Sequence, residues 1–157
     1  IVFWNNRNIR RKQPADLILA FNTFCEKLDP KKAEQCALFM HTQISDDNGT
    51  DLMAVKTALC PKYKVIFSDR SLDQKTLNFM YNVADVTVNI ASNEGFGISW
   101  CESLHAGTPI INNVTGGLQD GCRFSSNVSV IPEYYKINII SFLKIIRPII
   151  IFFNIWT

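Results

Sequence analysis

The sequence lacks the patterns that small disulfide-bonded and zinc-binding proteins depend on. Its five cysteines are an odd number, widely spaced, and no two of them form a C-x-x-C pair. Such usage excludes a disulfide framework or a zinc site, and it is typical of reduced, buried thiols. We therefore expect a cytoplasmic protein.

The chain also has little excess charge of either sign. Sixteen Lys and Arg residues face fourteen Asp and Glu residues, so the formal net charge is only +2 over 157 residues. This is too small to indicate nucleic acid or an anionic membrane as a partner. A hydrophobic share of 47% with 19% charged residues excludes a disordered chain. The length supports one domain with its own core.

A complete dinucleotide-binding fingerprint is missing. Gly95 and Gly97 have the first spacing of G-x-G-x-x-G, but Trp100 stands where the third glycine belongs. This departure argues against a nicotinamide- or flavin-dependent oxidoreductase.

Strand-forming runs alternate with helix-period segments along the first 113 residues. Between the runs, Pro14 opens one helix that ends at Asp29-Pro30, and a capping box from Ser71 to Gln74 opens another. The alternation predicts an α/β fold, a Rossmann-like doubly wound parallel sheet, in which ligands bind beyond the carboxyl ends of the strands. The predicted strands lie at residues 1–4, 37–40, 65–67, 86–90 and 109–111.

The loop after the first predicted strand, residues 6–12, is strongly basic. It holds four of the sixteen Lys and Arg residues within six positions. A charge run is usually a solvated surface, but this one stands at the sheet edge where anionic ligands dock. Arg offers paired planar donors to phosphate oxygens, and Lys offers a compact charge.

A second loop, after the fourth predicted strand, combines glycines with carboxylates. Gly95 and Gly97 let the backbone approach a ligand, and the following helix presents N–H groups to an anion. Glu94 and Glu102 flank this turn, eight positions apart. Two interpretations are about equally favoured: the carboxylates bind paired sugar hydroxyls, or Glu94 caps the helix and Glu102 is a surface residue.

The two loops together resemble the C-terminal domain of retaining glycosyltransferases of the GT-B fold. Glu94 and Glu102 match the E-x7-E pattern of that family, and the Gly116-Gly117 pair matches its glycine turn. Arg7 and Lys12 resemble its G-R-x-x-x-x-K diphosphate loop, with asparagine in place of the usual glycine before the arginine. The resemblance spans about residues 1 to 121.

The resemblance implies a role for each matching residue. Arg7 and Lys12 would bind the diphosphate of a nucleotide-sugar donor, and Glu94 would bind hydroxyls of the transferred sugar. Glu102 would hold the ribose hydroxyls. Backbone groups that meet sugar or phosphate would come from Gly95, Phe96, Gly97 and Ile98.

The implied activity is transfer of a sugar, with retention, from a nucleotide-diphosphate sugar to a carbohydrate or another hydroxyl acceptor. An N-terminal acceptor-binding domain would be missing from this chain. No D-x-D triplet occurs, and we expect neither a divalent metal nor another cofactor, as in metal-independent members of the family. A domain that binds a nucleotide sugar without turnover is the alternative.

We expect a donor-binding domain over residues 1–125 and a separate apolar tail over residues 126–157. Nine isoleucines fall within residues 137–157. Three interpretations are open: a membrane anchor, a helix that packs on a neighbouring domain, and translation out of frame. The last is favoured, since the motifs stop near Gly121, and it predicts poor packing after Pro132.

Overall fold

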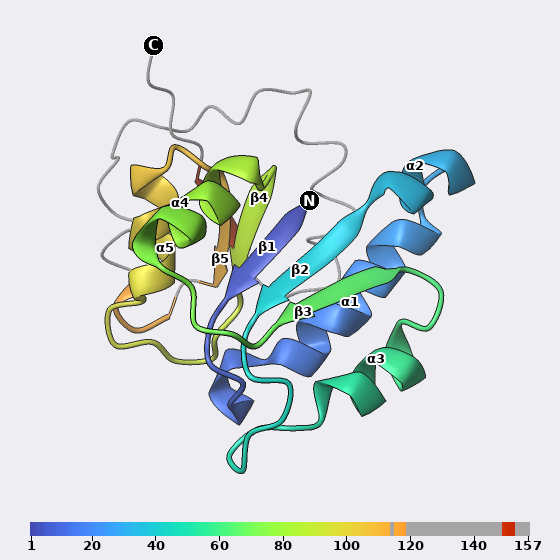
Figure 1. Ribbon diagram of the computed structural model, residues 1–157, viewed down its shortest axis with the longest axis horizontal. Coiled ribbons are helices and arrows are strands. Elements are labelled where there is room, and N and C mark those ends of the chain that lie inside the picture. The colour runs from blue at the N-terminus through green and yellow to red at the C-terminus, as the bar shows by residue number, and fades with distance from the viewer. Residues whose placement is uncertain (114, 119–148, 153–157) are drawn as a thin grey trace.

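The computed structural model describes residues 1–113, 115–118 and 149–152 of the chain. They form one sheet with the strand order β3-β2-β1-β4-β5-β6, in which β1 to β5 are parallel and β6 runs antiparallel to β5 (Figure 1). The predicted α/β doubly wound sheet is confirmed. Its strands are β1 (Val2–Asn5), β2 (Ala37–His41), β3 (Lys64–Ser68), β4 (Val86–Asn89), β5 (Ile110–Asn113) and β6 (Ile149–Phe152).

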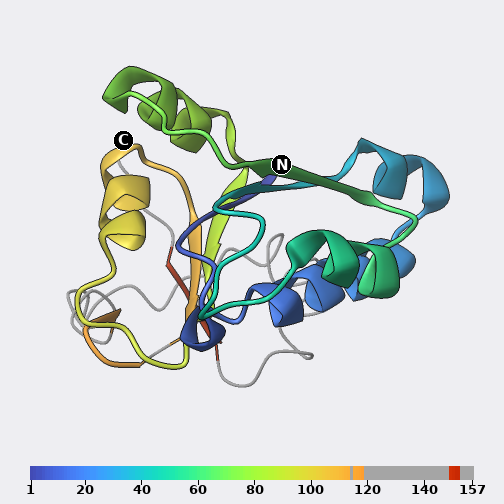
Figure 2. The ribbon, with the colours of Figure 1, turned by 60° about the horizontal axis from the view of Figure 1, so that its bottom comes forward.

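Helices cover both faces of the sheet (Figure 2). One face carries α1 and α3, and the opposite face carries α4 and α5. This arrangement follows from the right-handed crossovers that connect parallel strands. The helices are the 3₁₀ turn η1 (Arg10–Lys12), α1 (Pro14–Glu26), α2 (Pro30–Gln35), α3 (Leu52–Leu59), α4 (Gln74–Val83) and α5 (Ile98–His105).

The first strand joins the two halves of the core. Trp4 is fully buried among the residues of α1 and α3, including Leu17 and Phe21. Its neighbour Phe3 points to the opposite face and meets Tyr81 of α4 edge-to-face, with ring centroids 5.0 Å apart. Burying an aromatic side chain contributes about 1.5–3 kcal/mol. A strand that is apolar on both faces is typical of a buried central position in a parallel sheet.

Chain order reverses beside this central strand. From β1 the chain first builds β2 and β3 on one side, and then crosses back to build β4 and β5 on the other. The carboxyl ends of β1 and β4 therefore flank a topological switch point, where loops diverge and leave a crevice for a ligand.

Two helix boundaries differ from the sequence-based prediction. Asp29 does not merely end α1: its carboxylate accepts a hydrogen bond from the Lys31 amide and caps a separate short helix, α2. The predicted capping box from Ser71 is wrong, because the cap of α4 is Asp73, whose side chain accepts from the Thr76 amide at 2.7 Å. An aspartate at the N-cap, three residues before that amide, satisfies one of the orphan donors of the first helical turn.

One short segment of the predicted tail is described: Ile149–Phe152 pairs with β5 over four residues as an edge strand. Poor packing after Pro132 stays a prediction, and the other positions of residues 126–157 lie outside the described residues. None of the helices in the described part of the chain has the length and apolar character that crossing a bilayer requires.

Candidate active site

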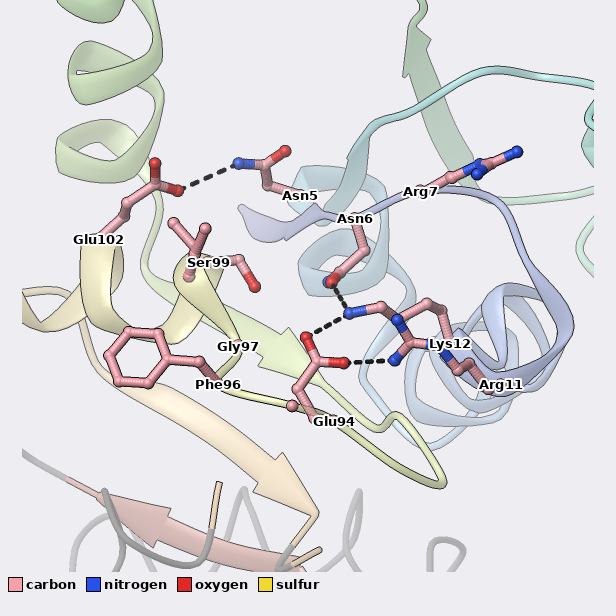
Figure 3. A pocket seen from close by; sticks show the side chains of 12 residues that line it. Asn5, Asn6, Arg7, Arg11, Lys12, Glu94, Phe96, Gly97, Ser99 and Glu102 are labelled. Carbon is pink, nitrogen blue, oxygen red and sulfur yellow. Dashed lines mark hydrogen bonds and ion pairs between the residues drawn. The ribbon is translucent and has the colours of Figure 1, made fainter. Parts of the chain in front are cut away.

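A cavity of about 530 Å³ opens at the switch point, between the loops that follow β1 and β4 (Figure 3). All eight residues singled out from the sequence line it, and four further residues complete the lining. The predicted eight are Arg7, Lys12, Glu94, Gly95, Phe96, Gly97, Ile98 and Glu102; the others are Asn5, Asn6, Arg11 and Ser99.

The basic loop is held in place by a buried asparagine. Asn8 is fully buried, and its amide nitrogen donates to the carbonyl oxygens of Thr50 at 2.7 Å and Ile44 at 3.2 Å. Gly49 lies so close that a Cβ there would stand 2.2 Å from the Asn8 carbonyl oxygen. The chain then turns through η1 into Gln13, a left-handed residue with φ 54°, before α1 begins.

Three charged side chains meet on one wall of the cavity. Glu94 is 7% exposed, and its two carboxylate oxygens have different partners. Lys12, also buried, donates from Nζ to Glu94 Oε1 and to Asn6 Oδ1, the latter at 2.8 Å. Arg11 donates from Nη1 to Glu94 Oε2 at 2.7 Å (Figure 3). The buried carboxylate is thus compensated by two cations, as a buried charge requires.

Arg7 lies apart from this cluster. Its side chain is 61% exposed, and its guanidinium bonds Asp46, with Nε 2.7 Å from Oδ2. Figure 3 shows Arg7 directed away from Glu94. The hydrogen bond from Arg7 lowers the pKa of the Asp46 carboxyl and raises the pKa of Arg7. The structure therefore brings Lys12 to Glu94, but not Arg7.

The loop that carries Glu94 is supported by the Gly116-Gly117 turn. The Gly117 amide donates to the Glu94 carbonyl oxygen at 2.7 Å. A Cβ on Gly117 would stand 1.7 Å from the Gly95 carbonyl oxygen, and one on Gly116 would stand 2.1 Å from that of Glu94. Gly116 also has φ 52°, so this close packing admits glycine alone.

The cavity floor contains the start of α5. Gly97, with φ 81°, is the N-cap, and a Cβ there would stand 2.6 Å from Trp100 Cδ1. The first turn of a helix presents backbone N–H groups that suit an anion. Phe96 and Ile98 flank the cap and are 60% and 67% exposed. Both side chains line the cavity.

Glu102 lies at the other end of the cavity and is held by partners on two elements. Its Oε2 accepts from the Tyr81 hydroxyl at 2.7 Å and from Asn5 Nδ2 at 3.4 Å. Asn5 Nδ2 also donates to the Tyr81 oxygen at 2.9 Å. Burial, with the neighbouring Glu102 carboxylate, raises the pKa of Tyr81 well above its ordinary range, so the hydroxyl remains a donor. Glu102 is thus not a simple surface residue.

Sequence reasoning missed Arg11, Asn5 and Tyr81 as members of the site. Arg11 belongs to the basic run that the sequence already marked, but the motif directed attention to Arg7 and Lys12. Asn5 is the last residue of β1, a position that the switch-point rule does favour. Tyr81 carries no local signal, because its contact with Glu102 joins residues 21 positions apart.

The described residues contain no group of three or more His, Cys, Asp or Glu side chains that could hold a metal ion. The four cysteines within the described ranges, Cys25, Cys36, Cys60 and Cys101, are free. The expectation that no divalent metal takes part stays a prediction.

No protein-family profile matches the chain, and no curated protein matches it. Solved structures do. A trehalose-6-phosphate synthase, OtsA, superposes with a TM-score of 0.68 at 15% identity, covering 92% of this chain and 35% of that one. A structure described as trehalose-6-phosphate from E. coli bound with UDP-2-fluoro glucose gives 0.64 at 13% identity and the same coverage.

The C-terminal domain of a glycosyl transferase group 1 family protein (LpcC) from Francisella tularensis gives a TM-score of 0.57 at 17% identity, covering 74% of this chain and 59% of that one. The chain has the fold of the C-terminal domain of GT-B glycosyltransferases. It spans about a third of the length of the trehalose-6-phosphate synthases, with 30% coverage of one OtsA structure and 35% of another.

Proposed function

We propose that the chain is the donor-binding domain of a retaining glycosyltransferase, which transfers a sugar from a nucleotide-diphosphate sugar to a carbohydrate or another hydroxyl acceptor. One observation carries the proposal: Lys12 and Glu94, from the loops after β1 and β4, meet in the cavity at the switch point of the sheet. A cation beside a carboxylate suits a ligand that combines a diphosphate with a hydroxyl-bearing sugar.

In this proposal, Lys12 binds the diphosphate. An ammonium group has three hydrogens, and Asn6 and Glu94 accept two of them, which leaves one for a phosphate oxygen. Arg7, whose own side chain is exposed, lines the same cavity and would reach the diphosphate by exchanging its Asp46 partner for the ligand. The departing nucleoside diphosphate gains negative charge in the transition state, where these cations and the first turn of α5 stabilise it.

The two carboxylates would bind hydroxyls at the two ends of the donor. A carboxylate has about four acceptor positions. Lys12 and Arg11 fill two of those on Glu94, so the others can accept hydroxyls of the transferred sugar. Glu102 keeps Oε1 for the ribose hydroxyls while Oε2 bonds Tyr81. Gly95, Phe96, Gly97 and Ile98 would supply the backbone that faces sugar and phosphate.

The proposal needs no metal or other cofactor, because Arg7 and Lys12 are assigned the charge neutralisation that a divalent ion would otherwise supply. We further propose that the acceptor binds between this domain and an N-terminal domain outside this chain.

Calorimetric titration with UDP- and GDP-sugars, each beside its free nucleoside diphosphate, tests the proposal. We expect the chain to bind at least one sugar nucleotide, and Glu94→Gln to weaken that binding about tenfold, because a charged acceptor of sugar hydroxyls is lost. Glu34→Gln removes the same charge from an exposed position on α2 and is the matched control. A folded sample that binds none of these compounds contradicts the proposal.

A domain that binds a nucleotide sugar without turnover is the second candidate. It is favoured by the lining of the cavity, because the residues assigned above all bind the donor and none of them is assigned to the acceptor. Release of nucleoside diphosphate in the presence of a panel of sugar acceptors separates the two. Turnover supports the enzyme, and binding without turnover supports the second candidate.

A further inference from the structure

Arg11 ties the two loops of the cavity together. Its backbone carbonyl oxygen accepts from the Ser92 amide at 2.8 Å. Its Nη1 donates both to the Asn93 carbonyl oxygen and to Glu94 Oε2, each at 2.7 Å. One residue after β1 therefore bonds three successive residues after β4, and the last of these is the carboxylate on the cavity wall.

A count of hydrogens shows what this contact does. Nη1 of an arginine carries two hydrogens, and Asn93 and Glu94 accept both. The Nη1 end of the guanidinium is thus committed to the loop after β4, while Nε and Nη2 carry three further hydrogens. Lys12 keeps one of its three hydrogens beyond those accepted by Asn6 Oδ1 and Glu94 Oε1.

The two cations also hold different oxygens of the same carboxylate. Lys12 fixes Oε1 and Arg11 fixes Oε2, so the plane of the carboxylate is determined only when both are present. A phosphate that attracts Lys12 would loosen its hold on Oε1. The bond from Arg11 would then be the one that keeps Glu94 in place, since the Asn93 contact anchors the guanidinium to the same loop.

We infer that Arg11 is a positioning residue: through its Nη1 hydrogen bonds it orients Glu94 toward the sugar of the donor. The inference rests on the proposed function and assigns a role that the diphosphate motif, with Arg7 and Lys12, does not include. It makes Arg11 a determinant of the preference for a sugar nucleotide over the free nucleoside diphosphate.

The test compares two affinities in the whole chain. For Arg11→Ala, we expect calorimetry to show about tenfold weaker binding of the sugar nucleotide and less than about threefold change for its nucleoside diphosphate. Arg10→Ala is the matched control, because Arg10 is an exposed neighbour that lines a different cavity, beside Asn8 and Gln13. Arg11→Lys, which keeps a charged donor, should lie between wild type and Arg11→Ala.

A double-mutant cycle shows whether Arg11 acts through Glu94. In a Glu94→Ala background, Arg11→Ala should change sugar-nucleotide affinity less than about twofold, because nothing remains to be oriented. Equal weakening of both ligands would identify Arg11 as a phosphate ligand and overturn the inference. An unchanged preference, or a full tenfold effect without Glu94, would overturn it as well. These outcomes differ from failure of the proposed function, in which the wild-type chain binds no nucleotide.

Arg11 has a 48% exposed side chain, so its substitution removes little buried surface. Circular dichroism and the urea midpoint of each variant establish that it is folded before its affinity is measured. A variant that folds but loses only sugar discrimination is the expected result.

Discussion

Arg7 and Lys12 match the same diphosphate motif, yet they stand in opposite environments. The Lys12 side chain is 7% exposed and bonds Asn6 and Glu94, while the Arg7 side chain is 61% exposed and bonds Asp46. One cation is built into the wall of the cavity, and the other lies at its rim. Two residues with one expected role therefore contribute differently to the fold: Lys12 supports the loops, and Arg7 does not.

The difference comes from the turn between the two residues. Arg7 precedes η1 and points toward the loop that contains Asp46, whereas Lys12 is the last residue of η1 and points toward the loop after β4 (Figure 3). Arg7 lies three residues before this turn, so the two side chains belong to different segments of the loop and face different neighbours.

Lys12→Ala should have the largest effect. It leaves the buried Glu94 carboxylate with one cation instead of two, and removing a partner from a buried ion pair costs about 3 kcal/mol of unfolding free energy. Nucleoside diphosphate affinity should fall about a hundredfold, because a charged donor is lost. Urea unfolding and calorimetry measure the two losses. Arg10→Ala serves as a charge-matched control. A Lys12→Ala variant as stable as that control would contradict the conclusion that Lys12 supports the loops.

Arg7→Ala should affect binding more than stability. The guanidinium is 61% exposed and the Asp46 carboxylate keeps its hydrogen bond from the Asn48 amide at 2.9 Å, so the urea midpoint should fall much less than for Lys12→Ala. Nucleoside diphosphate affinity should fall about tenfold if the guanidinium turns to the ligand. Calorimetry with UDP and GDP checks this. An affinity equal to that of wild type would show that Arg7 stays on Asp46, and the diphosphate would then rely on Lys12.

Asp46→Asn should produce the smallest change in nucleoside diphosphate affinity, and that change should be an increase. The substitution removes the competitor for Arg7, so nucleoside diphosphate affinity should rise about threefold. Weaker binding by Asp46→Asn in calorimetry would mean that Asp46 positions Arg7 instead of competing for it.

Asp46, which accepts hydrogen bonds from Arg7 and from the Asn48 amide, also predicts a pH dependence of stability. The pKa of Asp46 is lowered in the folded protein, so its contribution to stability is present above the ordinary aspartate pKa of about 3.9 and is lost as the pH falls through the lowered value. The difference in urea midpoint between wild type and Asp46→Asn should therefore be constant near neutral pH and shrink below about pH 3.9. A difference that persists in full at pH 2 would contradict the assignment.

Periodicity and turn residues predicted most of the fold. The apolar run at residues 1–4 correctly predicted a strand, β1, and the helix expected after Gly95 and Gly97 is α5. The central place of β1 in the sheet was not predicted. Local rules were weaker where several caps compete. Ser71 and Asp73 both precede α4 at capping distance, and only the packed chain selects Asp73.

The candidate site was predictable only where a motif has fixed spacing. Arg7, Lys12, Glu94 and Glu102 could be named because their separations match a pattern, and all four line the cavity. Their partners could not be named. The bonds of Arg11 to Glu94 and of Tyr81 to Glu102 span 83 and 21 positions, and the sheet order sets them rather than any local sequence preference.

The close packing of Gly116 and Gly117 on the backbone of Glu94 and Gly95 has a consequence for variation among related chains. The second glycine of the pair has less than the width of one methyl group available, with 1.7 Å from a Cβ to the Gly95 carbonyl oxygen. A side chain at Gly117 would shift the loop that carries Glu94, whereas the hydrophobic core beneath α1 and α3 would stay intact. We expect such a chain to fold and to lose the geometry of the proposed donor site. A substitution at Gly117 can therefore preserve the fold and still change the shape of the cavity.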